Sequence, residues 1–567
     1  MSVPRPEYPR PQFVREAWLN LNGPWDFSFD EPGFDRTITV PFAYQAALSG
    51  IGTDERHDRV WYRRAFALPE DWAGKRVLLH FGAVDYTCKV WVNGALAGGH
   101  TGGHAGFSLD VTEALRPGEN VLTVLAEDDH ADREMPRGKQ YWGEKPRSIF
   151  YTPTSGIWQT VWLEPVSEDR LLSVRVTPDL AGRQVFFDYE LSRPGLVLTA
   201  AAACPDGAAV SVRSDGEARG RLVLSLDRDG LDGGAFADQY AWSPEHPALF
   251  RTVYEVRAEA EVTDRVSGYF GLRSIAVADG KILLNGRPYY QKLLLDQGYW
   301  PDGLLTAPTD AAFVTDIEAC KAMGFNGVRK HQKVEDPRFL YHADRLGLLV
   351  WGEMANAYVF SGRYVRRFTA EWMEVLERDY NHPCIVAWTP LNESWGVNEI
   401  SSDPRQLHHC KALVELTKSL DATRLVMSND GWEQTIPDVL GIHDYEAKAD
   451  ILRQRYASLE SILAFRPADR AVFAPGCRYA GQPVMVTECG GISFRSQGGA
   501  WGYTDTKTPE EFLETYRQVV ASLLSSELVQ GFCYTQLTDV QQEQNGLLTF
   551  DRRPKFDFAA IREINEG

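Results

Sequence analysis

Residues 385–396 read IVAWTPLNESWG, an apolar run that ends abruptly at the polar pair Asn392 and Glu393. An apolar run of this length is typical of a strand that is covered on both faces, as in a parallel sheet. A helical pattern precedes the run at Phe368–Tyr380, and another follows it at Leu407–Leu420. A strand between two helices is the unit from which parallel α/β sheets are built.

The same strand–helix unit recurs through residues 276–567. Further helical patterns lie at Thr309–Met323 and Pro509–Leu523. The predicted strands, in chain order, are Gln291–Leu295, Val328–His331, Leu348–Glu353, Ile385–Leu391, Arg424–Ser428, Val439–His443, Val484–Glu488 and Gly531–Thr535. Eight strands that alternate with helices predict a C-terminal (β/α)8 TIM barrel.

The preceding part of the chain has a different pattern, with short alternating runs between turn signals. In residues 1–166, the run Tyr86–Val92 ends at an Asn-Gly pair at 93–94, which is a strong hairpin signal. In residues 167–275, the run Tyr254–Val262 alternates apolar and polar residues, which predicts a strand with one buried face. Two β-sandwich domains are therefore expected, the second with the length of an immunoglobulin-like domain.

The composition excludes several classes of protein. The formal charge is −19, from 59 Lys and Arg against 78 Asp and Glu. A surface this acidic repels phosphate backbones and anionic lipid, so nucleic acid and membranes are not expected partners. The eight cysteines include no CxxC pair, the N-terminus has no signal-peptide core, and no apolar run is long enough to span a bilayer. We expect a cytoplasmic protein that needs no metal or other cofactor.

Polar side chains follow every predicted barrel strand, where barrel enzymes place their reactive groups. Glu393 and Glu488 follow the fourth and seventh strands and are expected to face each other across the barrel mouth. Two facing carboxylates are what the cleavage of a glycosidic bond requires. The other strand-end candidates are Asp296, Arg329, His331, Glu353, Asn392, Asp430, His443 and Tyr445. Aromatic residues in the same region that could stack on a sugar ring are Trp300, Trp395, Trp432, Tyr358 and Tyr534.

Motifs along the whole chain resemble those of glycoside hydrolase family 2, which contains β-galactosidases, β-glucuronidases and β-mannosidases. They are LNGPWDF at 21–27, VWVNG at 90–94, SGIW at 155–158, YFGLR at 269–273, NGVR at 326–329, NHP at 381–383 and the Asn392–Glu393 pair. The resemblance implies a sugar-binding jelly roll over 1–166, an immunoglobulin-like sandwich over 167–275 and a catalytic barrel over 276–567.

The resemblance also implies a retaining mechanism, with Glu393 as the general acid/base and Glu488 as the nucleophile that forms a covalent glycosyl-enzyme. The carboxyl groups of a retaining pair lie about 5–5.5 Å apart. Arg329 is expected to keep Glu488 ionised, Asn392 to donate to the sugar 2-hydroxyl, and Tyr445 to steady the nucleophile. Weaker candidates for contact with the sugar are His331, His443, Asp296, Asp430, Glu353, Trp300, Trp432 and Tyr534.

Departures from the family pattern bear on the sugar. Glucuronidases of the family carry an Asn-x-Lys element that pairs with the substrate carboxylate, whereas the stretch QQEQNGLL at 541–548 has no lysine. Strand eight ends in FCYTQ at 532–536, without the usual Trp platform. We therefore predict an exo-acting β-glycosidase for a neutral sugar, with a β-galactoside as the first choice.

Several alternatives stay open at this stage. A β-galactofuranosidase or an arabinosidase is the runner-up, and a β-glucuronidase is disfavoured. A transglycosylase would use the same intermediate, and a carbohydrate-binding protein without catalysis is the remote alternative. The expected partner is a glycoside or oligosaccharide, and assembly into a homodimer or homotetramer is open because family members commonly form such oligomers.

Overall fold

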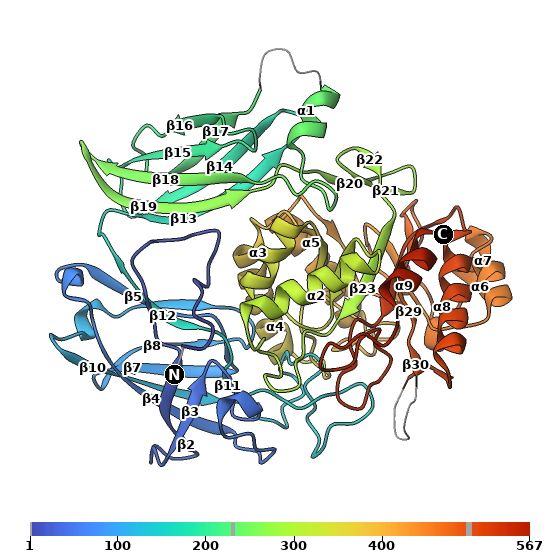
Figure 1. Cartoon of the computed structure of the whole chain (residues 1–567), viewed down its shortest axis with the longest axis horizontal. Coiled ribbons are helices and arrows are strands. Elements are labelled where there is room, and N and C mark those ends of the chain that lie inside the picture. Colours follow the sequence, from blue (N-terminus) through green and yellow to red (C-terminus); the bar gives the residue numbers. More distant parts are fainter. Residues whose placement is uncertain (1–2, 228–232, 495–501) are drawn as a thin grey trace.

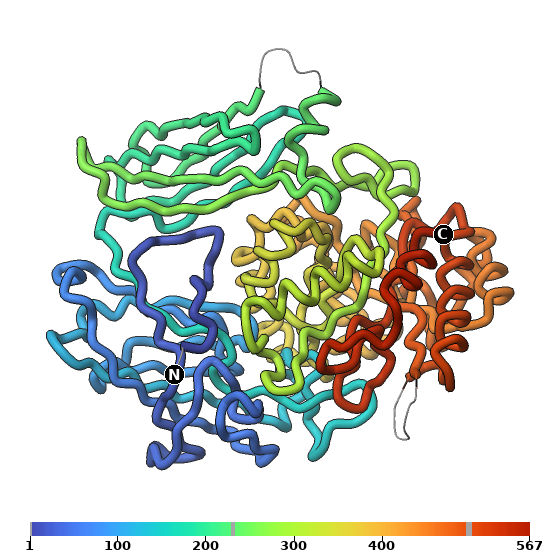
Figure 2. Tube along the Cα trace, viewed as in Figure 1, coloured from blue at the N-terminus to red at the C-terminus, as the bar shows by residue number. Residues whose placement is uncertain are grey.

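The chain forms two β-sandwiches and a barrel (Figure 1). The computed structural model describes residues 3–227, 233–494 and 502–567. Each of the three bodies has its own hydrophobic core. Figure 2 follows the chain from the first sandwich (blue) through the second (green) into the barrel (yellow to red). The predicted boundary after residue 166 follows β12 (Val161–Val166), whereas the one after residue 275 lies within the short strand β20 (Ile275–Ala278).

The first sandwich packs a sheet of four strands against a sheet of six. The smaller sheet contains β1 (Leu19–Asn20), β12 (Val161–Val166), β5 (Arg76–Phe81) and β9 (Phe107–Asp110). The larger one contains β3 (Arg36–Val40), β2 (Gly23–Phe29), β4 (Arg59–Ala67), β10 (Glu119–Glu127), β7 (Thr87–Val92) and β8 (Ala95–Thr101). Asn93 and Gly94 join β7 to β8 with φ of 52° and 83°, the left-handed geometry for which an Asn-Gly turn is suited.

The second sandwich corrects one strand prediction. One sheet contains β13 (Leu171–Asp179), β14 (Gln184–Leu191) and β17 (Arg219–Ser225). The other contains β16 (Ala209–Arg213), β15 (Val197–Ala203), β18 (Phe250–Ala258) and β19 (Glu261–Phe270). The run 254–262 is not one strand, because the chain reverses between β18 and β19 at Glu259, which has φ of 52°. The alternation continues through the turn, so the pattern alone does not reveal the reversal. Val262 is consequently exposed.

The barrel contains all eight predicted strands as one parallel sheet. Their bounds are β23 (Gln291–Asp296), β24 (Gly327–Lys330), β25 (Leu349–Glu353), β26 (Ile385–Thr389), β27 (Leu425–Val426), β28 (Leu440–Asp444), β29 (Val484–Gly490) and β32 (Val529–Thr535). The hydrogen-bonded order runs from β27 through β26, β25, β24, β23, β32 and β29 to β28. The (β/α)8 prediction is confirmed.

Helices cover this sheet from outside (Figure 1). They are α2 (Asp310–Ala322), α3 (Pro337–Leu346), α4 (Gly362–Asp379), α5 (Pro404–Leu420), α6 (Ala449–Arg455), α7 (Leu459–Ala464), α8 (Pro509–Leu524) and α9 (Phe558–Glu566). The four predicted helices correspond to α2, α4, α5 and α8, and the helices α3, α6, α7 and α9 are additional. In the described part of the chain, no helix combines the length and apolar character needed to cross a bilayer.

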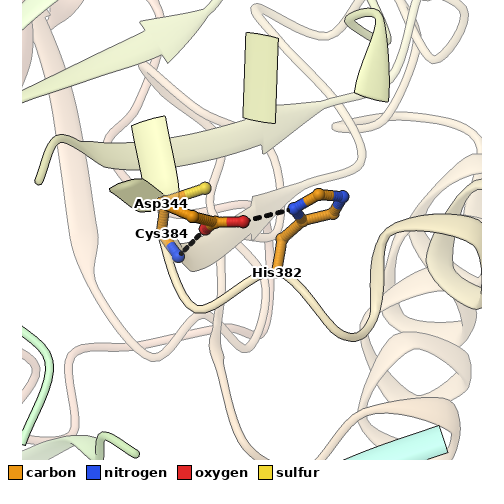
Figure 3. A group of neighbouring side chains, drawn as sticks. All are labelled: Asp344, His382 and Cys384. Atoms are coloured by element: carbon orange, nitrogen blue, oxygen red, sulfur yellow. Dashed lines mark hydrogen bonds and ion pairs between the residues drawn. The ribbon is translucent and has the colours of Figure 1, made fainter. Parts of the chain in front are cut away.

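The NHP motif joins the barrel to the second sandwich. His382 Nδ1 lies 2.6 Å from a carboxylate oxygen of Asp344, and the Cys384 amide donates to the other oxygen at 2.8 Å (Figure 3). The Tyr269 hydroxyl, at the end of β19, donates to the same carboxylate at 2.7 Å. The Asp344 carboxylate thus binds groups from both the barrel and the second sandwich, and this buried cluster links the two domains.

The first sandwich reaches the barrel through a long connection, residues 128–155, which lies between β10 and the short strand β11 (Gly156–Ile157). The Gly138 amide donates to the Asn356 carbonyl at 3.0 Å, and the Tyr358 amide donates to the Arg133 carbonyl at 2.8 Å. On the barrel side, both Asn356 and Tyr358 lie in the loop that follows β25. The connection therefore lies against the C-terminal ends of the barrel strands.

Candidate active site

Glu393 and Glu488 come together at the C-terminal ends of the barrel strands. Glu488 lies in β29, and Glu393 follows β26 by four residues. His443 lies between them, with Nδ1 at 2.7 Å from Glu393 Oε1 and 3.5 Å from Glu488 Oε2. One polar atom from each of these three side chains lies within 4.8 Å of the others. The two carboxylates thus share one small volume at the barrel mouth.

The backbone at Glu393 adopts a geometry that costs energy. Glu393 and Ser394 have φ of 52° and 59°, in the left-handed region that residues with a Cβ rarely occupy. The Glu393 amide donates to the Asp430 carbonyl at 2.9 Å, and the Ser394 amide donates to Asn429 Oδ1 at 2.7 Å. Strained backbone that its surroundings hold in place is a recurrent feature of functional sites.

Arg329 is the fixed cation of the site, and its side chain is fully buried on β24. Its guanidinium donates to Glu488 Oε1 at 3.0 Å and to Asn392 Oδ1 at 2.6 Å. It also pairs with Glu353 at 2.7 Å and with Asp430 at 2.9 Å. Burial works against its charge, but the surrounding carboxylates raise the pKa of Arg329 well above its usual value. Arg329 therefore holds a permanent positive charge beside Glu488.

Glu353 and Asp430 were predicted as sugar contacts, but the structure gives them another task. Glu353 accepts from Arg329 through one oxygen and from the Gln332 amide, at 3.0 Å, through the other. Asp430 accepts from Thr487 Oγ1 at 2.7 Å through the oxygen that does not contact Arg329. Both carboxylates are fully buried against the guanidinium, so the structure supports a role for them in positioning Arg329.

His443 is positively charged across the neutral pH range. Burial lowers the pKa of His443, but the carboxylates of Glu488, Asp430 and Glu393 outweigh this effect and raise the pKa from 6.5 to about 10. Its Nε2 lies 3.4 Å from Asp430 Oδ2. The side chain thus contributes a second cation to a site that carries several carboxylates.

This charge makes a testable contribution to stability. A His with a raised pKa in the folded protein contributes stability that is fully present below pH 6.5 and is lost as the pH rises towards 10. We expect His443→Gln to lower the Tm by roughly 5 °C at pH 6. The difference from the native protein should shrink as the pH approaches 10. Differential scanning fluorimetry across this range measures it, and a gap that stays constant or widens would contradict the assignment.

Tyr445 and Asn392 also occupy places that fit their predicted roles. The Tyr445 hydroxyl donates to Glu488 Oε2. Burial and the Glu488 charge raise the pKa of Tyr445 well above its usual value, so the phenol remains a donor. Asn392 is fully buried, and its Nδ2 has no hydrogen-bond partner among the described residues. A buried donor without a partner is costly in free energy, which indicates that a ligand satisfies it.

His331 lies beside the same carboxylates. Its Nδ1 is 3.1 Å from Glu353 Oε1 and 3.8 Å from Glu488 Oε1. Burial lowers the pKa of His331 well below its usual value, so the ring is neutral. It adds no charge to the site, and its Nδ1 has no hydrogen-bond partner among the described residues.

A cleft of about 710 Å³ opens beside Glu393. Trp432, Tyr445, Tyr503 and Phe465 line it, and the rings of Tyr445 and Tyr503 stack at 3.4 Å. The Trp432 indole lies 5.8 Å from the His443 ring. Of the aromatic residues predicted to meet the sugar or its leaving group, Trp432 is thus well placed to do so.

Two of the predicted sugar contacts, Asp296 and Trp300, lie away from the site. Asp296 accepts from Lys330 Nζ at 2.5 Å and from the Gly298 amide at 2.8 Å, which occupies both carboxylate oxygens. Trp300 is 2% exposed and packs edge-on against Phe313 of α2. We correct these two predictions, because both side chains are buried among residues of the chain itself, Asp296 at the end of β23 and Trp300 in the loop that follows.

Tyr534 is also turned away from the site. Its ring packs edge-on against Tyr516 of α8, with 5.0 Å between ring centroids. Its neighbour Cys533 instead lies within reach of the charges of Arg329 and Glu488. Successive residues of a strand point to opposite faces, so Cys533 faces the barrel interior and Tyr534 faces the helices.

The sequence predictions missed residues that the first sandwich adds to the barrel mouth. Lys139 lies 5.6 Å from the ring centroid of Trp395, a half-buried residue two positions after Glu393. Phe150 packs against the same indole at 5.7 Å. Neither residue belongs to a periodic strand or helix pattern, so the sequence offered no signal that this connection reaches the barrel.

Comparisons with known proteins agree with this architecture. Residues 19–132 match the model described as the sugar binding domain of glycosyl hydrolases family 2, and residues 275–566 match its TIM barrel domain. A β-galactosidase of Thermoanaerobacter pseudethanolicus is 27% identical over 418 residues, which cover 69% of this chain and 53% of that protein. A β-glucuronidase of Paenibacillus borealis is 24% identical over 97% of this chain and 96% of that protein.

Solved structures share the whole fold. A Bifidobacterium dentium β-glucuronidase complexed with coumarin-3-O-glucuronide superposes with a TM-score of 0.80, at 22% identity and 98% coverage of both chains. A β-galacturonidase from Eisenbergiella tayi superposes with a TM-score of 0.75, at 21% identity over 99% of this chain and 98% of that one. The chain spans about half the length of the first relatives it matches in sequence, at 53% and 44% of their lengths.

Proposed function

The chain belongs to glycoside hydrolase family 2, and on this basis we propose that it is a retaining β-glycosidase that releases a terminal sugar through a covalent glycosyl-enzyme. The observation that carries the proposal is the close approach of Glu393 and Glu488, which have polar atoms within 4.8 Å of each other. Retaining pairs lie about 5–5.5 Å apart, whereas inverting pairs lie about 6.5–9.5 Å apart to leave room for a water molecule.

The surroundings of the two carboxylates support different roles for them. Glu488 meets Arg329 through one oxygen and the Tyr445 hydroxyl through the other, so a cation and a donor hold the carboxylate in place. This is the environment of a nucleophile. The Glu393 side chain is 16% exposed and borders the cleft, where a leaving group would depart. His443 occupies Glu393 Oε1, which leaves Oε2 to carry the proton.

The proposed reaction has two balanced steps. In the first, a Glu488 oxygen bonds to the anomeric carbon while the bond to the leaving oxygen breaks and Glu393 gives that oxygen its proton. In the second, a water oxygen bonds to the anomeric carbon, Glu393 takes the water proton, and the ester bond to Glu488 breaks. Glu393 ends protonated and Glu488 ends ionised, as both began.

Product stereochemistry tests the proposal directly. Hydrolysis of a p-nitrophenyl β-glycoside followed by ¹H NMR should show the β-anomer of the sugar first, with the α-anomer appearing only by mutarotation. Initial release of the α-anomer would show inversion and would contradict the covalent intermediate. A panel of glycosides in the same assay identifies the substrate that the enzyme prefers.

The free Nδ2 of Asn392 leads to a second expectation. We expect Asn392→Asp to lower kcat/KM on a substrate with a 2-hydroxyl by about 10²- to 10³-fold, because this contact strengthens in the transition state. The Asp variant keeps an acceptor for Arg329, which now bonds Asn392 Oδ1. With the matching 2-deoxy glycoside, the native enzyme and the variant should differ by less than about threefold. Equal losses on both substrates would refute the proposed contact.

The glycone predicted from the sequence is neutral, with a β-galactoside as the first choice. That prediction relies on residues 541–548, which contribute Glu543 and Asn545 but no cation. Asn545 Nδ2 donates to Glu543 Oε1 at 3.2 Å, and the Tyr151 hydroxyl donates to Glu543 Oε2 at 2.5 Å. Residues 541–548 supply no cation, but a cation from another domain can also reach the sugar.

A further inference from the structure

We infer that Lys139, which the connection 128–155 carries to the barrel mouth, binds the carboxylate of a uronic acid glycone. The inference rests on the proposed glycosidase function and revises the neutral glycone predicted from the sequence. It assigns a specificity-determining contact to the first sandwich, where neither the strand ends nor the residues 541–548 suggested one.

The Lys139 side chain is almost fully buried, at 5% exposure. Its ammonium lies 5.6 Å from the centroid of the Tyr151 ring and 5.6 Å from that of Trp395. In the described part of the chain, this ammonium has no ion-pair or hydrogen-bond partner. The Nζ atom keeps some contact with solvent, so a ligand can reach it. Two aromatic faces replace part of its lost hydration, and a ligand that brings its own negative charge would stabilise the ammonium further.

The backbone holds Lys139 in place, so the side chain is not a loosely tethered surface group. The Tyr151 amide donates to the Lys139 carbonyl at 2.9 Å. On one side, Gly138 is fixed to Asn356 of the barrel at 3.0 Å, and on the other, Gln140 Nε2 donates to Asp85 at 2.9 Å. Both flanking residues are thus anchored to different domains. A binding group held this firmly loses little entropy when it engages a ligand.

Lys139 is also close to the reacting groups. Its positive charge contributes to the low pKa of His331, after the larger effect of burial. His331 Nδ1 lies 3.8 Å from Glu488 Oε1. Trp395, over which the ammonium lies, follows Glu393 by two residues. The Lys139 charge is therefore felt where the sugar attached to Glu488 would lie.

The other charges at the mouth explain why this lysine matters. Four carboxylates, those of Glu353, Glu393, Asp430 and Glu488, face the cations Arg329 and His443. With Glu393 protonated as the proposed acid, the three remaining carboxylates still outnumber the two cations, and this excess of negative charge would repel an anionic sugar. Glu543, another nearby carboxylate, already accepts from Tyr151 and Asn545. Lys448 and Arg466 line the cleft beside Glu393, whereas Lys139 adds a cation next to Trp395 that could offset the charge of a uronate.

Kinetics on paired substrates test the inference. The native enzyme should prefer p-nitrophenyl β-D-glucuronide or β-D-galacturonide over the corresponding glucoside and galactoside. Lys139→Gln should lower the uronide-to-hexoside ratio of kcat/KM by about 10- to 100-fold, the loss expected for one charge-assisted hydrogen bond. Lys139→Arg should retain most of the ratio. Lys145→Gln, an exposed lysine of the same connection, is the matched control and should leave it unchanged.

Two results would overturn the inference while leaving the glycosidase function intact: a native preference for the neutral glycosides, or a ratio that Lys139→Gln does not change. A binding measurement separates the two proposals further. Isothermal titration with D-glucuronate and D-glucose should show a preference for glucuronate that Lys139→Gln removes. If no glycoside is hydrolysed, the proposed function fails, and equal binding of the two sugars to the native protein would then refute the role of Lys139 independently.

Discussion

Glu488→Gln is expected to lower kcat/KM by at least about 10⁴-fold on every glycoside that the enzyme hydrolyses, because the amide cannot form the ester to the anomeric carbon. The amide is nearly the same size as the carboxylate, and it still offers Arg329 an oxygen acceptor at the position that is now 3.0 Å away. Substrate binding should therefore change little. Steady-state rates and titration with the glycoside provide the two measurements.

A chemical rescue gives this experiment a sharp control. In a smaller variant, Glu488→Ala, added azide or formate can occupy the vacated space and attack the anomeric carbon in place of the carboxylate. The product should then be a glycosyl azide of the α-configuration, because only one displacement occurs. Glu510→Gln, an exposed carboxylate in the first turn of α8, serves as the matched variant and should retain activity. A Glu488→Gln enzyme with more than about a tenth of native activity would remove Glu488 as the nucleophile.

Glu393→Gln is expected to have an effect that depends on the leaving group. On a substrate with a poor leaving group, such as a methyl or oligosaccharide aglycone, kcat/KM should fall by about 10²- to 10⁴-fold, the usual contribution of a general acid. On a 2,4-dinitrophenyl glycoside, which needs no proton, the first step should proceed almost normally. The glycosyl-enzyme should then accumulate, since no base activates water for the second step.

Pre-steady-state kinetics and mass spectrometry can detect this intermediate. A burst of dinitrophenol and a mass increase on the peptide that contains Glu488 are the expected signs. Azide should accelerate turnover and yield a glycosyl azide with the β-configuration. Equal losses on good and poor leaving groups, without a burst, would show that Glu393 only positions the substrate. The two variants together thus separate the nucleophile from the acid/base.

The contacts around His443 add a constraint to this mechanism. The imidazolium lies 2.7 Å from Glu393 Oε1 and 3.5 Å from Glu488 Oε2. The proposed proton transfer from Glu393 to the leaving oxygen would therefore take place beside a buried cation. The stability difference predicted for His443→Gln tests the charge on which this reasoning depends.

Local sequence patterns were sufficient to predict features that depend on a single strand or turn. The apolar runs between helical segments predicted all eight barrel strands, and the pair at 392–393 marked the end of one of them. Because parallel barrel strands bring their C-terminal ends to one face, the sequence alone also predicts that Glu393 and Glu488 lie together. The Asn-Gly signal at 93–94 identified a turn for the same reason, since the backbone geometry there depends on two residues.

Predictions failed where the neighbours of a residue decide its role. Glu353 and Asp430 lie at strand ends like Glu488, but the carboxylates of both residues pair with the Arg329 guanidinium in the interior of the barrel. Tyr534 lies near the C-terminal end of β32, but successive side chains of a strand point to opposite faces. Its ring therefore packs against α8, and Cys533 faces the barrel interior. The hairpin between β18 and β19 was read as one strand because its alternation passes through the turn unchanged.

Contiguous stretches of the chain were enough to predict the sandwiches, the barrel, the family and the two central carboxylates, because these depend on periodicity and on short motifs. The meeting of the charges at the barrel mouth depends on the fold. Arg329, His443 and the carboxylates are separated by tens of residues, and Lys139 comes from a different domain. Electrostatic interactions fall off within a few ångströms in space and have no relation to distance along the chain. Only the folded structure could therefore show that a buried, unpaired lysine lies at the mouth of the barrel.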